Sequence, residues 1–297
     1  MGNKTFAVIF VFLFIAVSTG CATSTSQQTE GLTQGLLLAE PLPVDQRIQF
    51  AIARYNQILL QPSLADDERA ELFYKRGIVY DRAGLPNLAE FDFSQAVNLK
   101  ADMAEAYNSL GVHLIQKREF DRAYEAFDST LDIEPSYDYA LLNRGIALYY
   151  AGRPELGAAD LDDFYRKDTS DPFRVLWAYH GSAEVDALAA KLELLKRKQA
   201  LSSDHWAVSI IDLHLDLGSE IDVFNHLVQG VTSSSELTQR LCEAYFYLGK
   251  YHAFLGNHGV ALNYFKLSLS TNVYEYVEHR YARLEMAKIR ESIVANP

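Results

Sequence analysis

The chain offers few side chains at spacings that support chemistry. Its 297 residues include two cysteines, Cys21 and Cys242, and eight histidines. No His-Glu-x-x-His pair occurs, and His252 and His258 lie six residues apart across a predicted turn, so the sequence predicts no metal site and no cofactor. Cys242 has no neighbouring general base in the sequence and is expected to be a small buried apolar residue.

An enzyme is the alternative hypothesis. A peptidoglycan hydrolase would need a carboxylate pair, a metal set or a Cys–His couple around a cleft. The segment 172–241 supplies only four candidate groups, Glu184, Asp186, His205 and Asp212. They fall on predicted helices with no recognisable spacing, and the chain contains no Gly-x-Ser-x-Gly, P-loop or dinucleotide-binding glycine pattern. The sequence therefore predicts a non-enzymatic protein without catalytic residues.

Cys21 is the cysteine with an informative context. A start with one charge precedes an apolar run of twelve residues, Phe6–Val17, and the small residues Ser18–Gly20. This pattern predicts a cleaved signal peptide over 1–20. A cysteine directly after the small residues is typical of bacterial lipoproteins, in which the thiol is acylated; an ordinary secretory signal is the alternative. Because Ala22 is not Asp, we expect sorting to the outer membrane, with the protein facing the periplasm.

Composition limits the partners of the mature chain. Residues 21–43 are predicted to be a lipidated flexible tether, because Thr23–Gly35 is rich in Thr, Ser, Gln and Gly. The formal net charge of −12 and the lack of a basic stripe exclude nucleic acid as an expected partner. With Cys21 acylated, Cys242 has no cysteine left to form an internal disulfide with.

The elements that must position any site follow from a repeat. Glycine recurs at intervals of 34 residues, at Gly77, Gly111 and Gly145. A small residue follows each glycine by twelve positions, at Ala89, Ala123 and Gly157. An apolar residue follows each glycine by sixteen positions, at Phe93, Phe127 and Leu161. A helix–turn–helix unit of this length, with small residues at the helix crossings, is the tetratricopeptide pattern, and such repeats usually bind other proteins.

We therefore predict an all-α, tetratricopeptide-like helical-hairpin solenoid over residues 44–297. Its predicted parts are the repeats 70–103, 104–137 and 138–171, a degenerate segment 172–241, a further repeat 242–275 and a capping helix 276–293. The degenerate segment is expected to form two hairpins, with helices at Glu184–Gln199 and His205–Leu217. The capping helix should present a polar outer face, made of Arg280, Arg283, Glu285, Lys288, Arg290 and Glu291.

Several stretches go beyond a generic repeat. They are Phe91–Ala96, Ala123–Ser129, Asn143–Tyr150, Asp171–Arg174, Phe246–Tyr251 and Val277–Ala282. In these stretches the chain resembles the NlpI-type outer-membrane lipoproteins of Gram-negative bacteria. The resemblance extends from about residue 45 to 285, and it is weaker across 181–241.

The resemblance carries functional expectations that the periodicity does not. It implies an all-helical homodimer in the periplasm, anchored in the outer membrane by its lipid. It also implies an adaptor that brings a murein endopeptidase to a C-terminal processing (tail-specific) protease. A role in gathering other peptidoglycan enzymes during cell-wall growth and division follows from the same likeness. An outer-membrane assembly factor is a further alternative.

The candidate binding residues come from the repeat register, because the first helix of each hairpin lines the concave face. They are Tyr74, Ile78, Asn108, Val112, Tyr139, Leu142, Ile146, Tyr149, Tyr150, Phe246 and Lys250. Tyr74 and Ile78 stand where chaperone-binding repeats carry Lys and Asn, so a carboxylate clamp of that kind is absent. Three explanations for this tyrosine-rich groove stay open. It holds a partner segment, it is filled by the N-terminal helix or a second subunit, or its residues form the core between repeats.

Overall fold

The protein is described here by a computed structural model covering residues 37–295, so the predicted signal peptide, Cys21 and the tether up to residue 36 lie outside the described residues. The described residues form fourteen helices and no strand, which confirms the all-α prediction. The helices are α2 (Gln46–Leu59), α3 (Asp66–Arg82), α4 (Pro86–Leu99), α5 (Ala104–Gln116), α6 (Phe120–Ile133), α7 (Asp138–Tyr150), α8 (Pro154–Lys167), α9 (Pro172–Ala183), α10 (Ala187–Lys198), α11 (Val208–His214), α12 (Glu220–Leu227), α13 (Ser234–Phe254), α14 (His258–Ser270) and α15 (Val277–Ala295).

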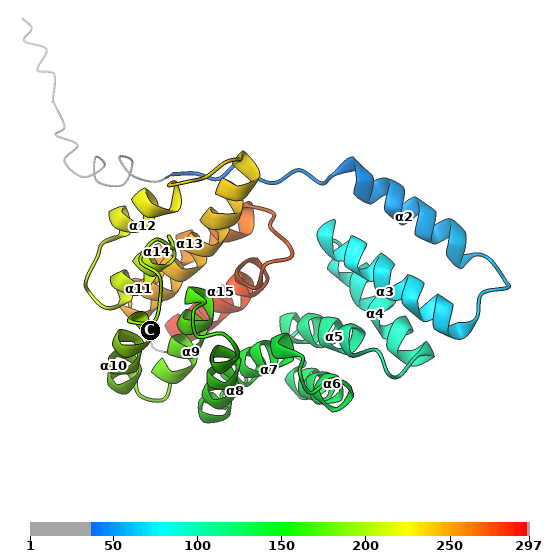
Figure 1. The fold of residues 1–297 in the computed structure, drawn as a ribbon, viewed down its shortest axis with the longest axis horizontal. Helices are drawn as coiled ribbons and strands as arrows, with labels where there is room; N and C mark the ends of the chain where they lie inside the picture. The colour runs from blue at the N-terminus through cyan, green and yellow to red at the C-terminus, as the bar shows by residue number, and fades with distance from the viewer. Residues whose placement is uncertain (1–36, 296–297) are drawn as a thin grey trace, which may run out of the picture. The chain divides into compact units, whose positions relative to one another are not determined.

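Consecutive helices pair into hairpins, as the predicted solenoid requires. The pairs are α3–α4, α5–α6, α7–α8, α9–α10, α11–α12 and α13–α14. Neighbouring hairpins lie side by side along a curved row, which Figure 1 shows most clearly for α3 to α8. The chain therefore folds as a tetratricopeptide-like solenoid.

The recurring glycines mark the points where the two helices of a hairpin touch. A Cβ added to Gly77 would lie 2.7 Å from the Phe93 ring, and one added to Gly111 would lie 2.6 Å from the Phe127 ring. The same contact recurs between Gly145 and Leu161 and between Gly249 and Phe265. Because real Cβ atoms do not come so close to other atoms, only glycine allows this helix spacing. In every case the side chain that contacts the glycine belongs to the residue sixteen positions further along the chain.

A partly buried ion pair links the two helices of the first repeat, and another links those of the third repeat at the same sequence spacing. Arg76 donates from Nε and Nη2 to the two carboxylate oxygens of Asp92, both at 2.7 Å. Arg144 holds Asp160 in the same two-pronged way, at 2.7 and 2.8 Å. Paired N–H···O bonds of this kind fix the relative orientation of the groups that they join. The pairs therefore fix how the two helices are aligned in these two hairpins, α3–α4 and α7–α8.

The segment 172–241 contains two irregular hairpins, and its two expected helices are shorter than predicted. The helix expected over 184–199 begins at Ala187, because the Asp186 side chain accepts hydrogen bonds from the first turn, at 3.0 Å from the backbone nitrogens of residues 188 and 189. The helix expected over 205–217 is α11, of only 7 residues. Helix α13, the first helix of the repeat predicted to begin at Cys242, starts earlier, at Ser234, since Ser233 caps it there.

The strap, residues 37–44, precedes the first helix and lies against the far end of the solenoid. The Leu42 backbone N–H donates to the Thr271 carbonyl at 2.8 Å, and the Thr238 hydroxyl donates to the Glu40 carbonyl at 3.0 Å. The sequence predicts residues 37–43 of this segment to be part of the flexible tether. In the structure, residues 37–43 are instead fixed to α13 and to the end of α14.

The first hairpin and the last helix also meet directly. Arg280 of α15 donates to Asp81 of α3 at 2.7 Å, and Arg82 of α3 pairs with Glu275, just before α15, at 2.7 Å. Burial alone would raise the pKa of Asp81, but His113 and Arg280 outweigh it and hold that pKa below its ordinary value. The curved row of hairpins is therefore closed by contacts between its beginning and its end.

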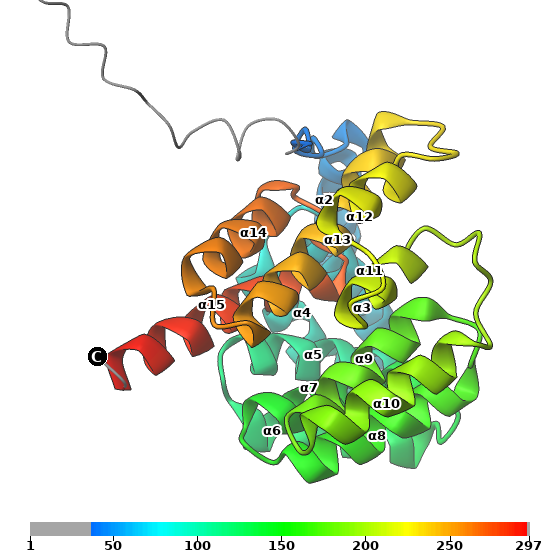
Figure 2. The same ribbon diagram turned by 90° about the vertical axis from the view of Figure 1, so that its left-hand side faces the viewer.

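Helix α15 does not cap the end of the stack, as its sequence had suggested, but lies across the concave face. Tyr281 and Ala282 are fully buried, and the Tyr281 hydroxyl donates to Asn143 of α7 at 3.3 Å. Glu285, which was expected on the polar outer face, is only 2% exposed. Figure 2 shows the last turns of α15 projecting beyond the hairpins. The helix buries one face, so an amphipathic sequence predicted its existence but not its location.

Candidate functional site

Most of the predicted concave residues belong to the interior of the protein. Those that are at most 9% exposed are Asn108, Val112, Leu142, Ile146, Tyr149, Phe246 and Lys250. Tyr74, Ile78 and Tyr150 are half-buried, whereas 57% of Tyr139 is exposed. The repeat pattern therefore predicted these positions as one face of the solenoid. In the structure, most of them are interior residues and only Tyr139 is exposed.

The groove is partly filled by the protein itself, and the occupant is the C-terminal helix. The Tyr150 hydroxyl donates to Glu285 of α15 at 2.9 Å, and Lys250 of α13 donates to the same carboxylate at 2.7 Å. Self-occupation was expected from the N-terminal helix or a second subunit. Helix α2 instead packs on α3, and α15 contacts Tyr150 of α7 and Lys250 of α13.

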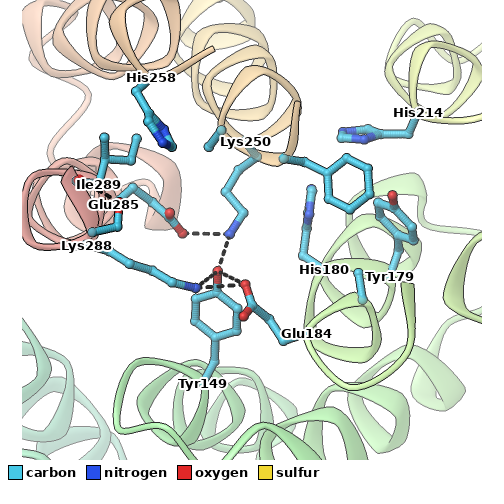
Figure 3. A pocket seen from close by; sticks show the side chains of 14 residues that line it. Tyr149, Tyr179, His180, Glu184, His214, Lys250, His258, Glu285, Lys288 and Ile289 are labelled. Carbon is cyan, nitrogen blue, oxygen red and sulfur yellow. Dashed lines mark hydrogen bonds and ion pairs between the residues drawn. The ribbon is translucent and has the colours of Figure 1, made fainter. Parts of the chain in front are cut away.

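A network of charges lies where α15 meets α7, α9 and α13; Lys250 and Glu285 are its buried members, and Lys288 and Glu184 are its exposed ones (Figure 3). Lys250 donates to Glu285 and to the Tyr149 hydroxyl, both at 2.7 Å. Lys288 donates to the same hydroxyl at 2.9 Å and to Glu184 at 2.7 Å. Tyr149 in turn donates to Glu184 at 3.0 Å. Two ammonium groups thus face two carboxylates, and their formal charges balance.

Burial and the neighbouring charges set the protonation of this network. Burial lowers the pKa of Lys250, and Glu285 partly offsets that effect. Burial would raise the pKa of Glu184, but the Lys288 ammonium outweighs it and keeps the pKa below the ordinary value. Burial and the nearby carboxylates raise the pKa of Tyr149 well above that of a free tyrosine, so its phenol stays protonated. The network therefore holds α15 in place as a set of paired ions.

The exposed part of the concave face is a tyrosine rim, formed by Tyr74, Tyr137 and Tyr139. Burial raises the pKa of Tyr137 to about 12, and the nearby Tyr74 and Glu105 add to the shift. Burial, then Glu105 and Glu71, also raise the pKa of Tyr74. Sequence reasoning missed Tyr137, because the repeat register assigns it to the turn before α7. Its signal was the run of two tyrosines within three residues, 137–139.

The four candidate residues of the enzyme hypothesis each have a separate role in the structure. Glu184 belongs to the network around Tyr149, and Asp186 caps α10. The His205 ring nitrogen Nδ1 accepts from a backbone N–H at 3.2 Å, and Asp212 pairs with a lysine of α10. The structure does not gather them around one cleft, so they form no catalytic arrangement of the kind that hydrolysis requires.

Within residues 37–295, no group of three or more His, Cys, Asp or Glu side chains is placed to hold a metal ion. Over the same described range, no helix combines the length and apolar character needed to cross a bilayer. Cys242 is buried, and burial raises the pKa of its thiol to about 12, so it stays protonated.

The fold and the concave face define a helical-repeat protein of the tetratricopeptide type. No protein-family model matches the chain. Among solved structures, it is similar to a tetratricopeptide-repeat protein from Parabacteroides merdae, at 11% identity and a TM-score of 0.49, over 83% of this chain and 100% of that one.

Two other solved structures show the same kind of likeness. MamA is similar at 20% identity and a TM-score of 0.46, over 51% of this chain and 86% of that one. YrrB, described as a tetratricopeptide-repeat protein with an unusual peptide-binding site, is similar at 13% identity and a TM-score of 0.43, over 77% of this chain and 97% of that one. The chain's own hairpins and glycine contacts establish its repeat fold.

Proposed function

We propose that this protein is a non-catalytic adaptor that binds partner proteins through the tyrosine rim. The observation that carries the proposal is the exposure of Tyr139 of α7, 57% of which is accessible while the other predicted binding residues are buried or half-buried. Tyrosine supplies a large contact area and a hydroxyl at a small cost in side-chain entropy, so it is enriched at protein interfaces. The rim is thus the part of the concave face that remains available to a partner.

The charges around the rim define the kind of segment that it accepts. Glu71 and Glu105 lie close enough to the tyrosines to raise the pKa of Tyr74, and Glu105 is exposed. The whole chain carries a net charge of −12. Complementary charges steer association and select among partners. We therefore expect the bound segment to combine apolar side chains with lysine or arginine.

The resemblance to NlpI-type lipoproteins supports a specific set of partners. In this proposal the protein binds a murein endopeptidase and presents it to a C-terminal processing protease, and so affects cell-wall growth and division. Other peptidoglycan enzymes are candidate partners on the same basis. The support consists of the sequence stretches that carry the resemblance and a repeat fold that suits an adaptor.

A binding assay with purified proteins tests the adaptor role. The fragment from residue 22 onward is titrated with the processing protease and with the endopeptidase, and Tyr139→Ala is expected to weaken binding at least tenfold. Phe91→Ala is the matched control, because Phe91 is an aromatic residue of α4 with a similar exposure of 56%. Equal affinities for both variants would exclude the rim. Digestion of muropeptides by the fragment alone would exclude the non-catalytic proposal.

We also propose that acylated Cys21 anchors the protein in the outer membrane. Each buried methylene of a lipid chain contributes about 0.8 kcal/mol, so two or three chains bind essentially permanently. Cys21→Ser is expected to release the protein from the membrane fraction into the periplasm. If the variant still sediments with outer membranes, the lipid is not the anchor.

We also propose that the protein is a homodimer, as the resemblance implies, and the surface of α2 supports this proposal. No residue of this helix is buried, and Phe50 and the residue that follows the helix, Leu60, are 74% and 84% exposed. Exposed apolar side chains of this size commonly mark contact surfaces. Light scattering on the fragment from residue 22 onward should give twice the monomer mass, and a monomer mass at micromolar concentration would contradict the proposal.

A further inference from the structure

The strap is an extended segment that lies on the surface beside α13 (Figure 1). Its side chains alternate, because Leu37 and Ala39 are half-buried against the solenoid, whereas Leu38 between them is 62% exposed. Such alternation is typical of an extended chain that is held along one side. None of the side chains in residues 37–44 is fully buried, so release of the strap would expose little apolar surface.

Two hydroxyl groups of α13 hold the strap by its backbone. Thr238 and Tyr245 are 3% and 0% exposed, and their spacing of seven residues places them on one face of the helix. The Thr238 hydroxyl donates to the Glu40 carbonyl at 3.0 Å, and the Tyr245 hydroxyl donates to the Leu37 carbonyl. Each of these carbonyls is the only acceptor of its hydroxyl among the described residues. The face of α13 thus recognises two main-chain carbonyls, three residues apart on one segment.

A third bond holds the other end of the strap. The Leu42 backbone N–H donates at 2.8 Å to the carbonyl of Thr271, the residue that ends α14. The last carbonyls of a helix have no acceptor role within it, so this one is available to another segment. None of the three bonds uses a side chain of the strap. Main-chain recognition of this kind accepts segments of different sequence, and specificity comes from the places that receive alternate side chains.

The strap does not fill the surface on which it lies. A half-open groove of about 520 Å³ remains between residues 42–44, α2, α3 and the loop 272–276. Its apolar walls include Val79, Val273 and Tyr276. A segment with a larger apolar side chain than that of Leu42 would bury more area in this groove than the strap does.

We propose that the strap covers a binding site for an extended segment of a partner protein, and that such a segment takes its place when the partner binds. The segment would carry a large apolar residue and a small one at the positions of Leu37 and Ala39, and a still larger apolar residue at that of Leu42. Until it is displaced, the strap is an autoinhibitory contact. The site lies on other helices than the tyrosine rim, so an adaptor would have one surface for each of two partners.

A peptide with the sequence of residues 37–44, acetylated and amidated, is the probe. The attached strap competes with it at a high effective concentration, so a weakened strap should open the site. In the fragment from residue 22 onward, we expect Leu37→Asp to raise the affinity for the peptide at least tenfold. Leu38→Asp is the matched control, because the exposed Leu38 does not contact the solenoid core, and it should bind like the unmodified fragment.

Two further changes examine the site itself. In the Leu37→Asp fragment, Thr238→Val keeps the volume but removes one donor, and it should weaken peptide binding at least fivefold at an unchanged circular dichroism spectrum. Thr169→Val, at an exposed position between α8 and α9, is its control. A peptide with Leu42→Trp should bind at least threefold more tightly than the unmodified peptide, because its side chain fills the groove.

Hydrogen exchange shows whether the strap is displaced. With an isotope-labelled unmodified fragment and an unlabelled peptide at saturation, the Leu42 amide of the chain should exchange at least tenfold faster, since it loses its bond to Thr271. The tyrosine rim has no part in these measurements, so failure of the proposed adaptor role would leave their outcome unchanged.

Four results would overturn the proposal. Equal peptide affinities of the Leu37→Asp and Leu38→Asp fragments would show that the strap does not cover the site. No binding to either fragment at millimolar peptide would show that the strap is a structural tie only. Binding without faster exchange of the Leu42 amide would place the peptide elsewhere. Loss of a dimer in the Leu37→Asp fragment alone would assign this surface to a second copy of the chain.

Discussion

At the residue scale, the contact between Gly111 and Phe127 determines how closely α5 and α6 approach each other. The glycine leaves no room for a side chain, since an added Cβ would lie 2.6 Å from the ring. By contrast, a Cβ at Gly259 of α14 would meet no atom within 4 Å. Glycine is therefore required at the first position by packing, and at the second position it only lowers helix propensity.

We predict opposite effects of alanine at these two glycines. Gly111→Ala should lower the free energy of unfolding by about 1–3 kcal/mol, because the helices must separate or the ring must move. Gly259→Ala should leave stability unchanged or raise it by up to about 1 kcal/mol. Urea denaturation followed by circular dichroism measures both. A neutral Gly111→Ala would show that the hairpin tolerates a wider spacing.

A second prediction at this scale concerns pH. Burial raises the pKa of Glu278 from 4.5 to about 7, and nearby Asp171 adds to the shift, although the Tyr247 hydroxyl donates to the carboxylate at 3.0 Å. The folded state thus favours the protonated carboxyl. Its contribution to stability is complete below pH 4.5 and is lost as the pH rises through about 7.

Glu278→Gln should remove this loss, because an amide does not ionise and its oxygen still accepts from Tyr247. The variant is expected to gain roughly 1–3 kcal/mol of stability relative to the unmodified protein between pH 4.5 and 8. Glu155→Gln, at an exposed position on α8, is the control. Urea denaturation at pH 4.5 and pH 8 gives the change in the free energy of unfolding. If this change is the same for Glu278→Gln and Glu155→Gln, the Glu278 carboxyl is not the group that lowers stability as the pH rises.

At the element scale, α15 converts predicted binding residues into interior residues. Tyr149 and Tyr150 were expected in an open groove, but their hydroxyls bond to Glu184 and Glu285 beneath the helix. Their rings meet edge to face at a centroid distance of 4.9 Å. The pair therefore stabilises the joint between α7 and α15, and a partner cannot reach Tyr149 while the helix is in place.

We therefore predict that Tyr149→Ala combined with Tyr150→Ala destabilises the fold rather than altering partner binding alone. Removing one buried and one half-buried ring should lower the free energy of unfolding by about 4 kcal/mol. Tyr139→Ala, at the exposed position in the same helix, should change it by less than about 1 kcal/mol. Thermal denaturation compares the two. Normal stability of the double variant would mean that α15 leaves the groove easily.

At the scale of the whole molecule, the solenoid is closed rather than open. Helical-repeat proteins usually make contacts only between neighbouring repeats. Here Arg280 of α15 reaches Asp81 of α3, a carboxylate that is also 3.2 Å from His113. The strap adds a second link between the two ends, through Leu42 and Thr271. These contacts should make unfolding more cooperative than in an open array of repeats.

A substitution of Arg280 tests whether the contact between α15 and α3 makes unfolding more cooperative. Arg280→Met should lower the free energy of unfolding by about 3 kcal/mol, because it removes one partner of a mostly buried ion pair. It should also broaden the transition, as the two ends begin to unfold separately. Arg283→Met, at an exposed position on the same helix, is the control. If Arg280→Met behaves like Arg283→Met, the end-to-end contact is not part of the cooperative unit.

The sequence by itself determined the helical hairpins of this protein, because their key contacts are local. Gly77 meets Phe93 and Arg76 meets Asp92, each across sixteen residues within one hairpin, so a periodic pattern records them directly. The positions on the concave face could be predicted from the sequence for the same reason. The exposed Tyr139 of the candidate site could be named from it.

Only the tertiary structure decided which of those residues remain open to a partner. The bond between Tyr150 and Glu285 spans 135 residues, and the one between Lys250 and Tyr149 spans 101. An amphipathic pattern states that α15 must bury one face, but it does not specify the surface on which that face is buried. The positions of α15 and of the strap depend on how all the hairpins curve together, which no local pattern contains.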